Sequence, residues 1–266
     1  MFPTCGDSAS SSSSVILLSP ILLRHVRKYS PVSCKALFTA VEMGKEDDVL
    51  FLLRLGVGAE INGKVNGRGV LYKAAGMGRL DLVRRLIESG ADLEVRDDLW
   101  RQTALHCASE NGFLEIVKYL SDKGAEVDTV DGWGFTPLFA ASSNGHLKIV
   151  KLLVDRGAKV DVISEGQKGS AARGVAPLHG ASTRGHDLVV QFLSQRGAKV
   201  NALDEWGQTP LHYASTNGSL QVVIFLFEKG AFVNVPNKWG ETPMKVAQKR
   251  KHTAIVNFLE SQGGRC

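Results

Sequence analysis

A short motif recurs along this chain at an almost constant spacing, and no other feature constrains the fold as strongly. Clear copies begin at Thr103, Thr136, Ala176 and Thr209, where the sequence reads TALHCA, TPLFAA, APLHGA and TPLHYA. A more divergent copy, TPMKVA, begins at Thr242. Together with two weaker units, the starts fall at positions 35, 69, 103, 136, 176, 209 and 242, which are 33 to 40 residues apart. Repetition with this period predicts a stack of small units instead of one globule.

Each unit carries the signals for two short helices. A threonine such as Thr136 can cap the first helix with its hydroxyl, and Pro137 and Pro210 suit the first helical position, where no N–H is needed. Gly145 marks the end of that helix, because glycine tolerates a positive φ. Apolar residues then recur every three residues over 147–153, as expected for one face of a second helix. Neither helix is long enough to be stable alone, so each unit has to pack against its neighbours.

The period and these marks together resemble the ankyrin repeat family. The resemblance covers residues 35–262 and implies an all-α repeat solenoid, in which stacked helix–turn–helix ankyrin units are joined by short β-hairpin-like fingers. The implied units are 35–68, 69–102, 103–135, 136–175, 176–208, 209–241 and 242–262, with a C-terminal tail at 263–266. The resemblance also implies structural roles for the motif residues Thr103, His106, Thr136, Pro137, His179, Thr209, Pro210 and His212.

The resemblance implies a non-enzymatic scaffold that binds a protein partner through a concave helical groove and the tips of the fingers. The sequence does not identify the partner, and an adaptor subunit that recruits substrates to a ubiquitin ligase or kinase complex is an open alternative. No catalytic residue, cofactor, metal or small-molecule substrate is expected. The run GAEINGK at 58–64 matches seven positions of a phosphate-binding loop, but Val65 stands where the magnesium-binding Ser or Thr belongs. We expect the protein alone to be monomeric.

The four tryptophans occupy equivalent places, shortly before the threonine of a repeat. Their register predicts a row along one edge of the stack, at the tips between units, with a break at the fifth unit. Each indole either packs over the neighbouring finger or belongs to an interface, since tryptophan is enriched among binding hot spots. The candidate partner-binding residues of this kind are Trp100, Trp133, Trp206 and Trp239.

A second candidate set stands just before the glycine between the two helices of a unit. Asparagine is common at helix ends, so local capping is one interpretation. A polar ladder that contacts a partner in the groove is the other. This set contains Asn111, Asn144, Arg184 and Asn217.

The net charge of +5 is concentrated at the two ends of the chain. Residues 1–34 carry +2 and residues 245–266 carry +4, which leaves 5 − 2 − 4 = −1 for the repeats between them. A nearly neutral body argues against a general grip on nucleic acid. Binding of nucleic acid through the basic C-terminus is therefore the weaker alternative.

Residues 1–34 do not share the repeat pattern. A serine tract is followed by the apolar run VILLSPILL at 15–23 and by basic residues at 24–28. Nine apolar-leaning residues interrupted by a proline are too few to span a bilayer, which needs about 20. We expect a disordered tail, with organellar targeting or an interfacial or partner-binding segment as alternatives. The four cysteines form no Cys-x-x-Cys pair, so a cytoplasmic or nuclear setting is expected.

The fourth and fifth units are separated by an insertion. Their starts lie 40 residues apart, which implies about seven extra residues relative to the repeat. Small and polar residues fill positions 163–174, in the sequence ISEGQKGSAARG. We therefore predict a mobile surface loop near 163–175, which is either a tolerated insertion or a site for a partner or modification.

Overall fold

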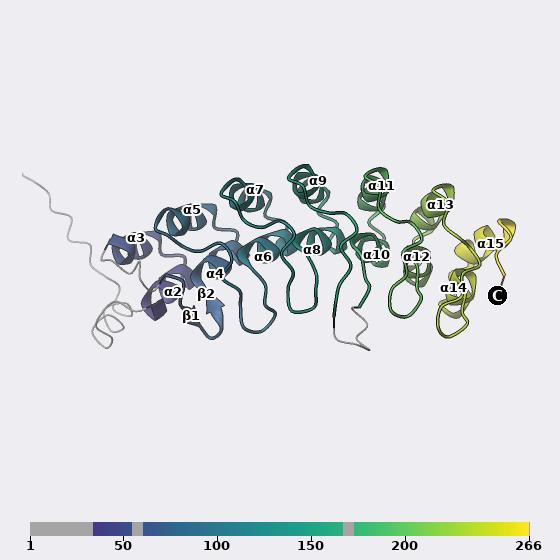
Figure 1. The fold of residues 1–266 in the computed structure, drawn as a ribbon, viewed down its shortest axis with the longest axis horizontal. Coiled ribbons are helices and arrows are strands. Elements are labelled where there is room, and N and C mark those ends of the chain that lie inside the picture. The colour runs from purple at the N-terminus through teal and green to yellow at the C-terminus, as the bar shows by residue number, and fades with distance from the viewer. Residues whose placement is uncertain (1–33, 55–60, 167–172, 266) are drawn as a thin grey trace, which may run out of the picture.

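Two rows of short helices run side by side along the molecule. The computed structural model describes residues 34–54, 61–166 and 173–265, and in these ranges 14 helices alternate between the rows (Figure 1). The inner row contains α2 (Cys34–Glu42), α4 (Val70–Gly76), α6 (Ala104–Asn111), α8 (Pro137–Ser143), α10 (Pro177–Thr183), α12 (Pro210–Asn217) and α14 (Pro243–Lys249). The outer row contains α3 (Glu46–Arg54), α5 (Leu80–Glu88), α7 (Leu114–Asp122), α9 (Leu147–Asp155), α11 (Asp187–Gln195), α13 (Leu220–Glu228) and α15 (Thr253–Ser261). The predicted all-α repeat solenoid is confirmed.

The inner helices begin with the predicted capping chemistry. Thr136 Oγ1 accepts a hydrogen bond from the N–H of Phe139 at 3.2 Å, and Pro137 is the first residue of α8. Thr209 caps α12 in the same way, with Pro210 in the first position. Because a local side chain satisfies an otherwise unpaired N–H, the start of each of these helices is set within its own unit.

The turn between the two helices of a unit requires a left-handed backbone. Gly112 and Gly145 supply it with φ of 81° and 75°, and in the last unit Lys251 adopts φ of 62°. Gly112 is needed for a second reason as well. A Cβ at this position would lie 2.7 Å from Cε1 of His146, which belongs to the next unit. The predicted helix end is therefore confirmed, and contact with a neighbouring unit adds a constraint that the repeat pattern alone does not show.

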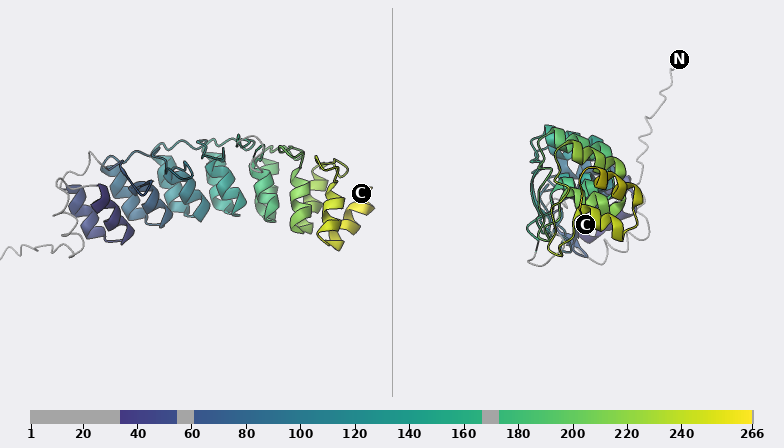
Figure 2. Two further views of the ribbon diagram at one scale, coloured as in Figure 1. Left: turned by 90° about the horizontal axis from the view of Figure 1, so that it is seen from below. Right: turned by 90° about the vertical axis from the view of Figure 1, so that its right-hand side faces the viewer.

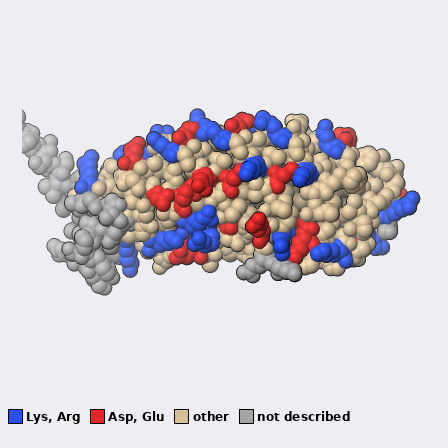
Figure 3. Space-filling view, in the orientation of Figure 1, with Lys and Arg blue, Asp and Glu red and all other residues tan. Residues whose placement is uncertain are grey.

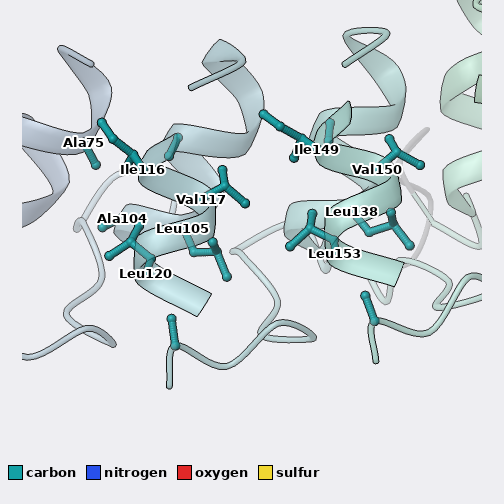
Figure 4. Packing of buried hydrophobic residues seen from close by; sticks show 14 of the residues in the cluster. Ala75, Ala104, Leu105, Ile116, Val117, Leu120, Leu138, Ile149, Val150 and Leu153 are labelled. Carbon is teal, nitrogen blue, oxygen red and sulfur yellow. The ribbon is translucent and has the colours of Figure 1, made fainter. Parts of the chain in front are cut away.

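The core is a continuous layer between the two helix rows. Leu138 of α8 is fully buried together with Val150 and Leu153 of α9. Figure 4 shows these residues and their counterparts in the preceding unit, Leu105 and Leu120. Inner helices contact the next inner helix and outer helices contact the next outer helix. This packing stabilises helices of only seven to nine residues, which would be marginal alone.

A finger precedes each inner helix from α4 to α14, and the fingers project to one side of the helices (Figures 1 and 2). The first described finger, at the start of the second unit, is a hairpin of β1 (Lys64–Val65) and β2 (Arg68–Gly69). Asn66 and Gly67 form its turn with φ of 51° and 76°, the two positive values of a type I′ turn. The strands pair antiparallel in the register Lys64–Gly69 and Val65–Arg68. The predicted hairpin-like fingers are therefore present.

The finger of the fifth unit, which precedes α10 and which we call the fifth finger, contains the insertion, and its two ends are bonded together. The N–H of Ser164 donates to the carbonyl of Val175 at 3.1 Å, and the N–H of Gly174 donates to the carbonyl of Ser164 at 2.8 Å. Ser164 is buried, and its Oγ accepts a further bond from the N–H of Val175 at 3.0 Å. Residues 163–166 and 173–175 thus belong to the finger itself. The rest of the predicted mobile loop, 167–172, lies outside the described residues.

The ends of the stack differ slightly from the expected boundaries. Cys34 is already the first residue of α2, one residue before the expected start of the first unit, and the last helix ends at Ser261. The remainder of the predicted N-terminal tail, 1–33, lies outside the described residues. Within the described ranges, no helix has the length and apolar character needed to cross a membrane.

Candidate functional site

One side chain shapes the tip of each finger in the middle and at the C-terminal end of the stack. Asp131 Oδ1 accepts hydrogen bonds from the N–H groups of Trp133 and Phe135, at 2.8 and 2.9 Å. Asp204 does the same for Trp206 at 2.8 Å, and Asn237 does so for Trp239 at 3.0 Å. Such bonds from Asp or Asn to backbone N–H groups two residues on fix a tight turn. The indoles are therefore carried on tips with a defined backbone.

The sequence predicts a turn-rich stretch at 131–134, DGWG, but the equivalent roles of Asp204 and Asn237 were not predicted. The available signal was an Asp or Asn two residues before Trp133, Trp206 and Trp239. In the third unit, Asp97 stands three residues before Trp100 and accepts its N–H at 3.0 Å. The finger there is one residue longer, and Arg101 takes up the difference with a φ of 58°.

The tryptophans form two stacked pairs instead of an even row. The ring centroids of Trp100 and Trp133 lie 6.2 Å apart with an interplanar angle of 29°. Those of Trp206 and Trp239 lie 5.5 Å apart with an angle of 20°. Each pair bridges two adjacent fingers, and the fifth finger, which carries the insertion, separates the pairs. The predicted positions at the tips and the predicted break are therefore both present in the structure.

Backbone hydrogen bonds reinforce both pairs. The N–H of Gly132 donates to the carbonyl of Trp100 at 2.7 Å, and the N–H of Lys238 donates to the carbonyl of Trp206 at 2.9 Å. The ammonium of Lys238 also lies 5.8 Å from the ring centroid of Trp206, within the range of a cation–π contact. Adjacent fingers are thus tied to each other at the level of the indoles.

The indoles differ in how much surface they offer. Trp100, Trp133 and Trp239 are 40%, 43% and 58% exposed, whereas Trp206 is half-buried beneath its neighbours. Exposed aliphatic side chains stand directly before the turn residue in three fingers, which the sequence interpretation missed. These are Val130, Ile163 and Leu203. We call the four tryptophans and these three aliphatic residues the finger strip.

The motif histidines connect three inner helices, α6, α10 and α12, to the following finger. His106 Nδ1 accepts the N–H of Thr103 at 3.2 Å, so Nε2 carries the proton and donates to the carbonyl of Phe135 at 3.0 Å. His179 and His212 repeat this arrangement at 3.1 Å for both bonds. Burial lowers the pKa of His106 to about 4 and keeps the ring neutral. These histidines serve as structural links, as the resemblance implied.

The fourth unit lacks this link, because Phe139 occupies the histidine position. Its ring stacks on Phe135 instead, with centroids 3.8 Å apart and an interplanar angle of 9°. Gly180 of the next inner helix makes room for it, since a Cβ there would lie 3.1 Å from the Phe139 ring. The position therefore tolerates either a bonded imidazole or a packed ring, which is a structural and not a catalytic requirement.

Comparison with known families agrees with this architecture. A family model described as ankyrin repeats (3 copies) matches residues 71–164 and again residues 165–265. The chain belongs to the ankyrin repeat family. The two matches meet inside the fifth finger, between Ser164 and Glu165, and two matches of three copies fit the six to seven predicted units. A search of curated proteins found no match. Ankyrin repeats are in general modules of protein–protein interaction, and the family is generally non-enzymatic.

The polar residues at the ends of the inner helices form hydrogen bonds within this ankyrin repeat protein. Asn111 Nδ2 donates to the carbonyl of Cys107 at 2.8 Å, as expected for local capping. Asn144 Nδ2 donates to the carbonyl of Ala140 at 2.9 Å, and its Oδ1 accepts from the Arg184 guanidinium at 2.6 Å. Asn217 Nδ2 donates to Ser219 Oγ at 2.7 Å. Their contribution to a partner-binding groove stays a prediction.

Side chains of both charges lie on the surface of the described residues (Figure 3). On the face shown in Figure 3, acidic side chains follow the middle of the molecule, and a group of basic side chains lies below them toward the N-terminal end. No group of three or more His, Cys, Asp or Glu side chains among the described residues is arranged to hold a metal ion. The partial sequence match to a phosphate-binding loop covers residues 58–64. Its described part, 61–64, leads into β1 and not into a helix, and residues 58–60 lie outside the described ranges. The basic residue Lys249 of the last unit is ion-paired with Glu241.

Proposed function

We propose that this ankyrin repeat protein is a non-enzymatic scaffold that binds a protein partner along its finger strip. The observation that carries the proposal is the exposure of Trp100, Trp133 and Trp239 on finger tips that are held in place. Large aromatic side chains in contact with water are unfavourable for an isolated protein, and they dominate the energetics of many interfaces.

The rigidity of the tips supports the same proposal. Asp131, Asp204 and Asn237 fix the turns, and backbone bonds connect neighbouring fingers. Side chains on a preorganised backbone lose little conformational entropy when a partner binds, so more of the contact energy appears as affinity. The groove residues Asn144 and Arg184, which already contact each other across two units, would form the polar border of such an interface.

The proposal is tested with the full chain and its partner, identified by affinity capture with mass spectrometry. Trp133→Ala and Trp239→Ala each remove one exposed indole, and Leu188→Ala removes a side chain of similar exposure (56%) from the outer helix α11. We expect each tryptophan variant to weaken affinity by about 2 kcal/mol, roughly 30-fold in Kd, and to lose no more stability than the roughly 1 kcal/mol that its stacked pair contributes. Leu188→Ala leaves the affinity unchanged.

A drop in melting temperature with unaltered affinity of the folded protein would assign the indoles to packing and refute the proposal. Trp206→Ala is the less informative variant, because that ring is half-buried against Trp239 and Lys238. Its loss is expected to disturb the pair as well as any interface.

The adaptor alternative requires two partners to be bound at once. The separation of the two tryptophan pairs by the fifth finger favours it, because each pair can contact a different chain. For an adaptor, we expect Trp133→Ala to release one partner and Trp239→Ala to release the other, as measured by sedimentation of the three-component mixture. A simple scaffold instead loses its single partner in both variants.

A further inference from the structure

A groove at the N-terminal end of the stack is separate from the finger strip. It lies between the first two inner helices and the first two described fingers, and it has a volume of 610 Å³. Cavities of this size, within about 300–1,000 Å³, are typical of sites that hold several side chains. Its lining includes Phe38 and Glu42 of α2, Lys73 of α4, Val65 and Arg68 of the first finger, and Leu99 of the next finger.

Apolar side chains form part of the floor and rim of this groove, beside charged residues of α2, α4 and the two fingers. Phe38 stands at the position where other units have the bridging histidine, so an aromatic ring and not a bonded imidazole forms the floor. Leu99 is 67% exposed at the rim, the largest exposed fraction among the large apolar residues in the described ranges. The acidic side chains are already engaged. Glu42 pairs with Lys73 at 2.9 Å and Asp98 pairs with Lys64, while the Asp97 carboxylate accepts backbone N–H groups of its own finger. The groove therefore offers Phe38, Val65 and Leu99 as apolar contacts, next to acidic side chains that are already engaged.

The chain itself supplies such a segment close by. The 33 residues before α2 include the apolar run at 15–23, which neither the repeat nor the proposed function uses. Residues 8–33 contain no Asp, Asn or Gly, the residue types that build the tips of the other fingers. This segment joins the stack at Cys34, four residues or about 6 Å along the helix from Phe38.

We propose that residues 15–23 bind in this groove of their own chain, with apolar side chains against Phe38, Val65 and Leu99. The ten residues that connect the run to α2, 24–33, span up to about 33 Å when extended, which is ample for the chain to turn back. A short tether holds the run at an effective concentration on the order of millimolar, so modest affinity suffices. The proposal goes beyond partner binding, and its test requires no partner.

The test uses limited trypsin digestion of the full chain. Trypsin cleaves after Arg24, Arg27 and Lys28, which directly follow the apolar run. Cleavage after Arg24 requires residues 21–23 to enter the protease, so when the run is bound the rate at this bond follows the population of the released form, whereas the bonds after Arg27 and Lys28 lie in the tether. We expect Leu99→Glu, which places a charge on the rim, to accelerate cleavage after Arg24 by about fivefold or more. Leu18→Glu within the run is expected to have the same effect.

Leu188→Glu is the matched control, because Leu188 is a similarly exposed leucine (56%) on the outer helix α11, outside both the groove and the finger strip. It should leave the cleavage rate as in the wild type, and circular dichroism should show that all variants remain folded. Equal rates for the wild type and Leu99→Glu would overturn the proposal. Protection that increases with protein concentration would overturn it too, because the occupant would then be a second copy of the chain.

Discussion

At the scale of single residues, histidine connects units from two different positions. In the inner helices, His106 and its equivalents donate forward to the next finger. At the start of the outer helices, a second set donates from Nε2 back to a carbonyl of the preceding unit. Its members and their acceptors are His146 to Glu110 (3.0 Å), His186 to Ser143 (3.1 Å) and His252 to Thr216 (3.1 Å). The described histidines thus link neighbouring units and require no catalytic explanation.

The forward-donating histidines make stability depend on pH. Burial lowers the pKa of His106 to about 4 and also lowers the pKa values of His179 and His212. In the unfolded chain, a histidine has its ordinary pKa of about 6.5. Below that pH the unfolded state binds more protons than the folded state, so the free energy of unfolding is greatest above about pH 6.5 and falls as the solution is acidified.

Each of these histidines contributes a slope of up to about 1.4 kcal/mol per pH unit over this window. His106→Phe places at this position the residue that the fourth unit has at Phe139 and removes one titrating group. We expect urea denaturation to show a shallower loss of stability for this variant than for the wild type as the pH is lowered from about 7 to 5. The same pH slope in both proteins would contradict the assignment.

At the scale of elements, the turn between the two helices of a unit is subject to two constraints. Its glycine has a left-handed backbone, and a side chain from the next unit closes over it. His146 lies over Gly112, His186 over Gly145, and Phe113 over Gly78. The glycine after the outer helix, such as Gly157 (φ 92°), is equally left-handed, but a Cβ there would meet nothing within 4 Å.

This difference gives a direct comparison of two substitutions. Both Gly112→Ala and Gly157→Ala cost about 1 kcal/mol for placing a Cβ in the left-handed region. Gly112→Ala has to displace the His146 ring in addition, and overpacking of this kind adds about 1–3 kcal/mol. Urea denaturation should therefore rank Gly112→Ala as clearly less stable than Gly157→Ala. Equal destabilisation would mean that the ring moves aside without cost.

At the scale of the whole molecule, stability is shared between neighbouring units. Every inner helix packs on the inner helices beside it, and the buried apolar residues form one continuous cluster. Contacts are made mainly between adjacent units, so damage in one unit weakens the units on either side before it reaches the ends.

Leu138→Ala tests this sharing. The side chain is fully buried in α8, so its truncation should cost about 2–5 kcal/mol in urea denaturation. Hydrogen exchange should accelerate in α6 and α10 as well as in α8, because both helices pack against α8. Leu188→Ala, at an exposed position of α11, should change stability by less than about 0.5 kcal/mol. Acceleration confined to α8 would show that the units unfold independently.

The sequence was sufficient for features that arise within one unit. Thr136, Pro137 and Gly145 act on their own helix ends, so their spacing predicts the helices directly. Features that depend on two units were only partly predictable. The register placed the tryptophans at the tips but did not show that Trp100 pairs with Trp133, because pairing depends on the distance between fingers. The contact of His146 with Gly112 was missed for the same reason.

The contact between each inter-helix glycine and the next unit has a consequence for how such proteins change by duplication or design. The repeated motif suggests interchangeable modules, yet Gly185 faces Ser219 where Gly112 faces His146. When a unit is moved to another place in the array, its glycine is covered by a different side chain from the following unit. Its own covering side chain then lies over a different glycine of the preceding unit. Units can therefore be exchanged where the glycine and the covering side chain fit the new neighbours. A library of shuffled arrays should retain particular pairs of adjacent units more often than particular single units.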